Sequence, residues 1–187
     1  SATENNLSYS IPTRDDDAIQ FRIAAREVNR IRHIVSLDRL LMLTSGGEWQ
    51  VAPANSDVLT PASAWPKNFA TEGANNVQPV VASNAVLYAQ ESGGRMIQLR
   101  YEWESSGYVV RDLSLMSPSR FTGYTLVDMT YAKAPHRMVW AVRSDGVLLG
   151  LTYLPEHDVA GWHEHDTLGT FESVAAVREG GETALYA

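Results

Sequence analysis

Two apolar segments joined by a short turn, residues 138–142 and 147–154, constrain the fold of this chain more than any other feature. The turn contains Asp145-Gly146, and Asp-Gly between apolar segments is a strong β-hairpin signal because both residues tolerate positive φ. Neither segment alternates apolar and polar residues. Strands of this composition are buried on both faces. We therefore expect other β-structure to pack against each side of this hairpin.

The same plan recurs along the chain at intervals of about 50 residues. Ser-Gly-Gly turns at 45–47 and 92–94 and a Ser-Asp-Gly turn at 144–146 each join two apolar segments. Repetition at this interval, with four short strands and a glycine turn per unit, is typical of β-propeller blades. The expected fold is all-β, with repeated four-stranded antiparallel units in a partial, β-propeller-like array. A β-sandwich is the alternative.

The pattern also predicts how the chain is organised. Residues 1–14 are polar and rich in turn formers, which is typical of a flexible N-terminal arm. Residues 15–187 then form a β-repeat domain, whose last unit begins at 171–186 without being completed, as expected for a fragment of a longer polypeptide. Strands are expected at 19–23, 31–37, 40–44, 48–51, 77–81, 84–89, 96–101, 126–131 and 159–165, and short helices at 24–29 and 111–117.

The composition narrows the possible functions. The net charge is −7 and the arginines are scattered, whereas nucleic-acid binders usually carry a basic stripe. The sequence contains no cysteine, so disulfides and thiolate metal ligands are excluded. No apolar segment approaches the roughly 18 residues that span a bilayer, and we expect no membrane segment.

A long connection is expected at residues 52–78, which are rich in Ala, Pro, Asn and Ser. A loop of this length in a compact domain usually has a functional role or takes part in contacts. Trp65 and Phe69 lie within it, and we expect both side chains to pack against the body of the domain. The same two residues are the candidates for contacts between subunits.

The most reactive cluster of side chains is His163, His165 and Asp166. Histidines two residues apart on a strand point to the same side and bind zinc when a third ligand is available. His157 and Asp158 are near enough in sequence to add ligands. The competing interpretation is a polar outer strand whose side chains satisfy one another by hydrogen bonding.

Glu102 and Glu104 flank Trp103, and on a strand they would share one face. Paired carboxylates of this kind are the catalytic groups of glycoside hydrolases, but a solvated strand edge is the better interpretation of these two. The five tryptophans occur roughly once per unit, which favours a repeated packing role. A carbohydrate-binding module would instead require exposed tryptophans.

An ordered set of segments carries a family resemblance. The segments are DDDAIQFRIA, VNRIRHIVSLDRLLMLTSGGEWQV, VQPVVASNAVLYAQ, YEWESSGYVVRDLS and RMVWAVRSDGVLLGLTYLPEHDVAGWHEHDT. In this order and spacing, from residue 15 to about residue 177, they resemble the tail-nozzle, or tail tubular protein B-like, structural proteins of short-tailed bacteriophages and prophages.

The resemblance implies a non-enzymatic structural component of the virion tail, made in the cytoplasm of the bacterial host. It implies a propeller-like domain that forms a ring with copies of itself, usually a hexamer, beneath the portal and adaptor proteins. DNA would pass through the ring without specific binding. The resemblance provides no catalytic residue, cofactor or metal ligand. The alternative function is a ligand-binding, carbohydrate-binding or metal-dependent hydrolytic β-propeller.

Overall fold

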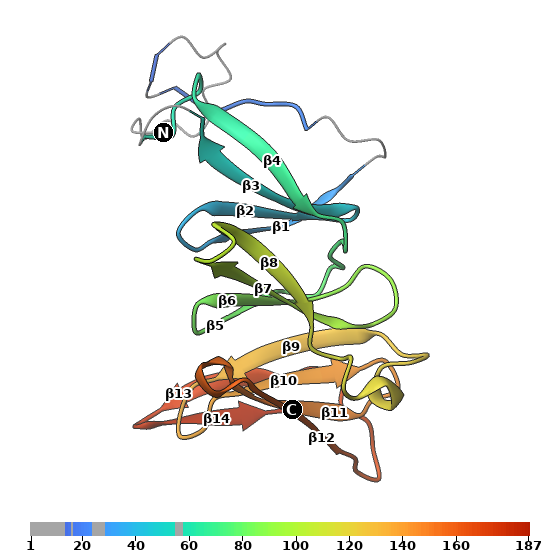
Figure 1. The fold of residues 1–187 in the computed structure, drawn as a ribbon. Helices are drawn as coiled ribbons and strands as arrows, with labels where there is room; N and C mark the ends of the chain where they lie inside the picture. Colours follow the sequence, from blue (N-terminus) through green and yellow to red (C-terminus); the bar gives the residue numbers. More distant parts are fainter. Residues whose placement is uncertain (1–13, 16, 24–28, 55–57) are drawn as a thin grey trace. The chain divides into compact units, whose positions relative to one another are not determined.

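The fold is all-β, as the sequence predicts. The computed structural model describes residues 14–15, 17–23, 29–54 and 58–187, which form fourteen β-strands and two short 3-10 helices, η1 (Pro118–Arg120) and η2 (Pro155–His157) (Figure 1). The chain divides into two compact units, of which the first ends at Gly73 and the second begins at Ala74. None of the described residues forms a helix long and apolar enough to cross a membrane.

The first unit contains one antiparallel sheet with the strand order β1-β2-β3-β4. Its strands are β1 (Ile31–Ser36), β2 (Leu40–Thr44), β3 (Gly47–Pro53) and β4 (Ala64–Ala70). A small core of Met42, Trp49 and Val51 lies on one face, where Ile23 and Leu59 pack against it. Each strand pairs with the next one along the chain, which is the up-and-down order of a propeller blade.

The second unit contains two sheets of the same type and a final hairpin. The first sheet consists of β5 (Val80–Ala82), β6 (Ala85–Ala89), β7 (Met96–Glu102) and β8 (Gly107–Asp112). The second consists of β9 (Leu126–Ala132), β10 (Met138–Arg143), β11 (Leu148–Leu154) and β12 (Val159–His165), and the hairpin of β13 (Ala175–Glu179) and β14 (Glu182–Tyr186). The strand β9 contacts both β5 and β13, so the first strands of successive sheets lie together in a propeller-like arrangement.

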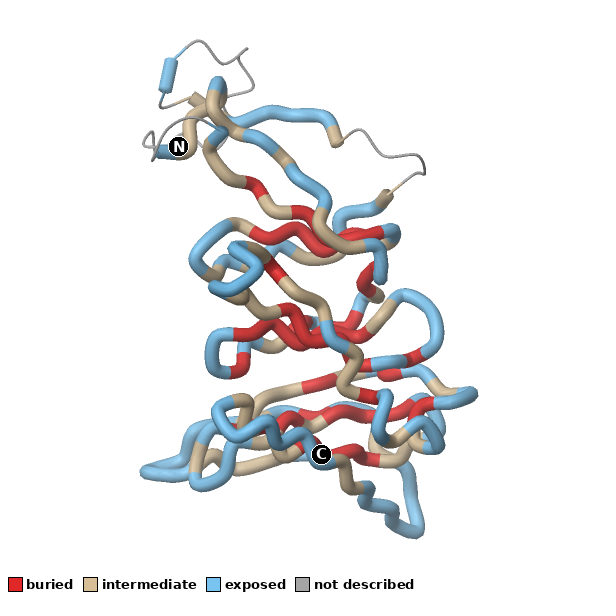
Figure 2. Tube along the Cα trace, in the orientation of Figure 1, coloured by how far each residue is buried: buried red, intermediate tan, exposed pale blue. Residues whose placement is uncertain are grey.

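Other segments of the chain pack against both faces of the β10–β11 hairpin, which confirms the expectation from its composition. Val139 and Ala141 of β10 pair with Leu151 and Leu149 of β11, and these four residues are completely buried on one face. Gln98 of β7 donates a hydrogen bond of 2.7 Å to the Tyr153 hydroxyl on this face. The sheet of β5–β8 therefore packs against this side of the hairpin, and Figure 2 shows the buried residues concentrated in the central strands.

The opposite face of β10 and β11 is covered by the last part of the chain. Val142 and Leu148 form a buried cluster there with Val174, and Phe171 and Leu185 pack around it. Backbone amides of the final segment also bond to side chains of β9: Val174 donates to Asp128 Oδ2 at 2.9 Å and Ala176 donates to Thr130 Oγ1 at 3.2 Å. The hairpin β13–β14 forms a two-stranded sheet within the region 171–186, where the sequence predicts strands.

The turn between β10 and β11 depends on one glycine. The Gly146 amide donates to the Arg143 carbonyl at 2.8 Å, and the Arg143 amide donates to the Val147 carbonyl at 2.9 Å. Gly146 has a φ of +83°, and a Cβ atom there would lie 2.5 Å from the Cβ of Thr170. This is a three-residue hairpin loop with a left-handed residue in third position, which explains why glycine follows Asp145.

The prediction of a long connection at residues 52–78 is wrong, because the strand β4 lies within this range and pairs with β3. Trp65 and Phe69 therefore lie on an edge strand rather than in a loop. Trp65 is 64% exposed, so the expectation that it packs against the body is wrong, whereas Phe69 is half-buried. The signal was weak because Pro66 and Asn68 interrupt the apolar pattern, and an edge strand tolerates such residues.

Other local predictions also differ from the structure. Residues 17–23 form no strand despite the alternation of Ile19, Phe21 and Ile23. The helix expected at 111–117 is replaced by the end of β8 and a turn at 113–116, because Asp112 and Leu113 continue the sheet region rather than a helical turn. The helix expected at 24–29 and the arm at 1–14 fall almost wholly outside the described residues.

Candidate functional site

His163 and His165 form a contacting pair on the edge strand β12. They are two residues apart on the strand and lie on the same face, as the sequence predicts. Nδ1 of His163 and Nε2 of His165 are 2.8 Å apart, so one ring nitrogen donates a hydrogen bond to the other. His165 is exposed and His163 is half-buried, which leaves this end of the sheet face open to solvent.

The neighbouring strands place an aromatic ring beside this pair and a glycine beneath it. Trp140 of β10, Gly150 of β11 and His163 form one row across the sheet. The Trp140 ring centroid lies 5.5 Å from that of His163 and 5.4 Å from that of His165. A Cβ atom on Gly150 would lie 2.0 Å from Cε1 of His163. The absence of a side chain at position 150 is therefore what allows the imidazole to lie over β11.

The surroundings of His163 disfavour its protonated form. Burial lowers the pKa of His163, and the nearby charges of His165 and Arg120 lower it further. An imidazole with a pKa below its usual range near 6.5 is neutral at pH 7. His163 therefore takes part in the pair as a neutral imidazole.

The third ligand expected from the sequence is missing from this pair. The described residues contain no group of three or more His, Asp or Glu side chains placed to hold a metal ion. Asp166 follows the end of β12 and is exposed, and His157 and Asp158 lie at η2, where Asp158 adopts the left-handed conformation. Catalytic zinc normally has three protein ligands. Among the described residues the arrangement is a pair of imidazoles.

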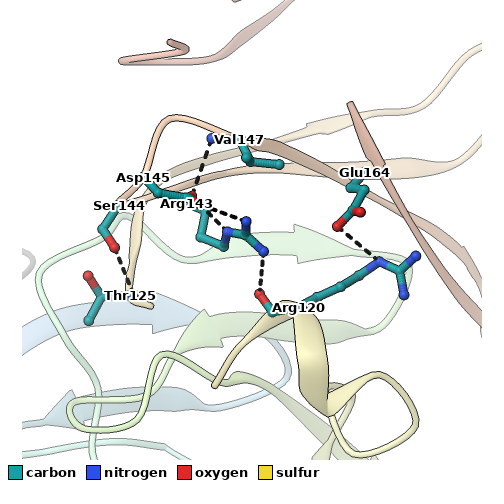
Figure 3. Close-up of polar contacts among 7 residues, drawn as sticks. All are labelled: Arg120, Thr125, Arg143, Ser144, Asp145, Val147 and Glu164. Carbon is teal, nitrogen blue, oxygen red and sulfur yellow. Dashed lines mark hydrogen bonds and ion pairs between the residues drawn. The ribbon is translucent and has the colours of Figure 1, made fainter. Parts of the chain in front are cut away.

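A second polar cluster surrounds Arg143 at the turn between β10 and β11 (Figure 3). The guanidinium donates two hydrogen bonds to Asp145, at 2.7 Å to Oδ1 and 2.6 Å to Oδ2, and a third to the Arg120 carbonyl at 3.0 Å. Its central carbon lies 3.9 Å from the centroid of the Tyr124 ring. The Arg143 side chain is only 9% exposed. It fastens the 118–125 segment to the hairpin turn.

The charges in this cluster satisfy one another. The hydrogen bonds from Arg143 lower the pKa of the Asp145 carboxyl and the same bonds raise the pKa of Arg143. Ser144 Oγ accepts a hydrogen bond of 3.2 Å from the Thr125 amide, and Arg120 Nε lies 3.6 Å from Glu164 Oε2 (Figure 3). The hydrogen bonds of Arg143 and Ser144 hold the loop in place, whereas Arg120 Nε has an ion-pair contact but no hydrogen bond.

Glu102 and Glu104 do not form a catalytic pair. The strand β7 ends at Glu102, and Glu104 lies in the following turn, so the two carboxylates do not share a strand face. Glu102 Oε1 accepts hydrogen bonds from Arg100 at 3.1 Å and from Arg111 at 2.9 Å. The Glu102 carboxylate therefore pairs with two arginines of adjacent strands.

The five tryptophans divide into two groups. Trp49 is buried, Trp140 contacts the histidine pair, and Trp162 donates a hydrogen bond of 2.8 Å to the Leu113 carbonyl, so these three have packing roles. Trp65 and Trp103 are 64% and 83% exposed. The repeated packing role predicted for all five tryptophans is confirmed only for Trp49, Trp140 and Trp162.

An apolar surface lies on the first unit. Ile31 and Ile34 of β1 are 50% and 61% exposed. They border a groove of about 800 Å³ whose floor includes Met42 and Val51 and whose rim includes Phe21. The described part of this unit therefore leaves a sheet face and an edge strand with apolar side chains in water.

Comparison with protein-family models gives no match, and comparison with curated proteins gives none either. Three surface features of the described residues are candidates for binding: the histidine pair, the exposed Trp103 turn, and the apolar face of the first unit.

Proposed function

We propose that this chain is a non-catalytic assembly module, and that the assembly is the tail of a bacteriophage or prophage. The proposed assembly role rests on the exposed apolar surface of the first unit. Ile31 and Ile34 lie on the edge strand β1 and Trp65 lies on the edge strand β4. Sheet edges with exposed apolar side chains are sites where polypeptide chains pair, and soluble monomers usually protect them.

The phage assignment is supported by the ordered resemblance of residues 15–177 to tail-nozzle proteins. Under this proposal the partners are further copies of the chain in a ring, which is a hexamer in the parent tail, together with the portal and adaptor proteins. The net charge of −7 supports a role in which DNA passes without being held, because phosphate binding requires clustered Lys and Arg. The chain would be made in the host cytoplasm and would function in the virion tail.

The test of assembly is light scattering coupled to size exclusion over a wide range of protein concentration. We expect a discrete oligomer, and we expect Ile34→Lys to weaken it by about 10- to 100-fold, because burying an isoleucine side chain contributes about 1.5–3 kcal/mol. Leu168→Lys is the matched control, since Leu168 is fully exposed in a loop rather than on a sheet edge. A monomer at every concentration, or equal effects of the two substitutions, would contradict the proposal.

Carbohydrate binding is the second candidate, and the turn after β7 favours it. Trp103 is 83% exposed at this turn, its ring centroid lies 6.2 Å from that of Tyr101, and the charged Glu102 precedes it. Exposed aromatic rings beside polar groups are suited to ring-shaped sugars because one side chain offers both apolar area and nearby hydrogen-bonding groups. Sugar addition should then change the tryptophan fluorescence of the wild type and of Trp65→Ala, and leave that of Trp103→Ala unchanged.

A further inference from the structure

The histidine pair on β12 brings two imidazole nitrogens close enough to bind one metal ion together. We propose that His163 Nδ1 and His165 Nε2 bind one Cu(II) ion, with solvent in the remaining positions. The pair lies outside the apolar surface of the first unit, so this site is independent of the proposed assembly function. Its two ring nitrogens are 2.8 Å apart.

The separation of the two nitrogens favours one coordination geometry. Imidazole nitrogens lie about 2.0–2.1 Å from a bound transition metal. Adjacent ligands of a tetragonal ion subtend about 90°, which places them about 2.8–3.0 Å apart, whereas tetrahedral ligands are about 3.3–3.4 Å apart. The hydrogen bond of 2.8 Å shows that the two nitrogens can approach as closely as adjacent tetragonal ligands do. Cu(II) prefers tetragonal nitrogen and oxygen ligands and has the highest affinity of the common divalent ions, so it is the ion best suited to the pair.

Binding requires a small rearrangement that the site permits. In the free pair one ring donates its N–H to the other nitrogen, so that proton must leave before both lone pairs can face a metal. The donor ring becomes the other neutral tautomer: one proton passes to solvent and one returns to the far ring nitrogen, so no net proton is released. The rings must also turn so that both lone pairs converge, and the exposed His165 has the space to do so.

The surrounding sheet keeps the pair accessible. The last segment of the chain bonds to Asp128 and Thr130 on β9, at the opposite side of the same sheet face. Gly150 leaves space beneath the His163 ring, where a Cβ atom would lie 2.0 Å from Cε1 and 2.6 Å from Nε2. The neighbouring carboxylate, Glu164, projects to the other face and lies near Arg120. The ion would therefore meet two imidazoles and water.

The adjacent indole makes the site observable. The Trp140 ring lies within 5.5 Å of both imidazoles, measured between ring centroids. A paramagnetic Cu(II) ion at this distance quenches indole fluorescence, so titration with the metal alone reports occupancy. Electron paramagnetic resonance then counts the coordinated nitrogens independently of the tryptophan.

The experiment is a titration of the whole chain with CuCl2 at pH 7, followed by fluorescence and by electron paramagnetic resonance. We expect one Cu(II) per chain with two nitrogen ligands. His163→Gln and His165→Gln should each weaken binding at least tenfold, since even loss of an outer-shell partner costs about 10–100-fold in metal affinity. His157→Gln, an exposed histidine on η2, is the control and should bind as the wild type does. Trp140→Phe should abolish most of the quenching and retain the resonance signal.

Three results would overturn the proposal. The first is equal Cu(II) affinity in the wild type and in the double variant H163Q/H165Q. The second is a resonance spectrum with a single nitrogen ligand at saturation. The third is tighter binding of Zn(II) than of Cu(II), which would contradict the tetragonal geometry. Circular dichroism of each variant confirms that the fold is retained, and H157Q shows the effect of losing a histidine elsewhere.

Discussion

Removing the carboxylate of Asp145 should destabilise the second unit through the buried guanidinium of Arg143. The two side chains form two hydrogen bonds of 2.7 and 2.6 Å, and the Arg143 side chain is 9% exposed. In Asp145→Ala the guanidinium would keep the Arg120 carbonyl, the Tyr124 ring and the electrostatic attraction of Glu164. A buried charge without its counter-ion is costly because water no longer solvates it.

The size of the effect follows from the number of bonds and the exposure of Asp145. Hydrogen bonds to charged groups contribute about 1.5–3 kcal/mol each, and breaking a buried ion pair costs about 3–5 kcal/mol. The Asp145 side chain is 32% exposed, so water entering its place recovers part of that loss. We expect the free energy of unfolding of the second unit to fall by about 2–4 kcal/mol in Asp145→Ala.

Equilibrium unfolding in urea, followed by circular dichroism and tryptophan fluorescence, measures this change. Asp38→Ala is the control, because the Asp38 side chain is 52% exposed and lies 3.9 Å from Arg39. Its loss should cost less than about 1 kcal/mol, as for other surface ion pairs. If Asp145→Ala loses no more stability than Asp38→Ala, the reasoning from burial is refuted.

Three further predictions follow from the same unit. Arg143 lowers the pKa of Asp145 in the folded protein. The ionised carboxylate therefore contributes stability above the unfolded pKa of about 3.9, and this contribution is lost as pH falls through the folded pKa. The free energies of unfolding of the wild type and Asp145→Ala, measured in urea, should therefore converge in acid. Gly150→Ala should displace the His163 ring, cost about 1–3 kcal/mol in the same unfolding measurement, and shift the imidazole proton resonances. Leu151→Ala should cost about 2–5 kcal/mol because Leu151 is completely buried, whereas Leu168→Ala should be neutral within about 0.5 kcal/mol.

The strands that could be predicted are those with a strong local signal. The β10–β11 hairpin is readable because Asp145-Gly146 specifies the turn and the flanking residues are apolar on both faces. β12 begins at residue 159 and ends at residue 165, as predicted. β4 and β8 were not predicted, since their residues are mixed in character and they form strands by pairing with β3 and β7. The formation of an edge strand depends on pairing with a neighbouring strand. Local sequence patterns do not report that pairing, because the neighbour lies beyond a turn or loop.

The candidate sites show the same division. Strand periodicity alone places His163 and His165 on one side of β12. Only the folded sheet brings Gly150 beneath one ring and Trp140 beside both, because these residues come from strands whose register is set by backbone pairing. The sequence also suggested Asp166 as a third ligand, but β12 ends before it and its side chain is exposed.

What the sequence determined by itself is the all-β class, the repeat of about 50 residues and the turns, because these depend on local conformational preference and on the period of apolar residues. Only the tertiary structure decided which polar side chains became buried partners and which apolar ones stayed in water. Arg143 is an ordinary turn residue in the sequence, and its burial depends on the 118–125 segment packing over it. Trp65 and Trp103 are as apolar as Trp49, and their exposure follows from their positions on an edge strand and at a turn. Burial depends on what packs above a residue, and that is a property of distant segments.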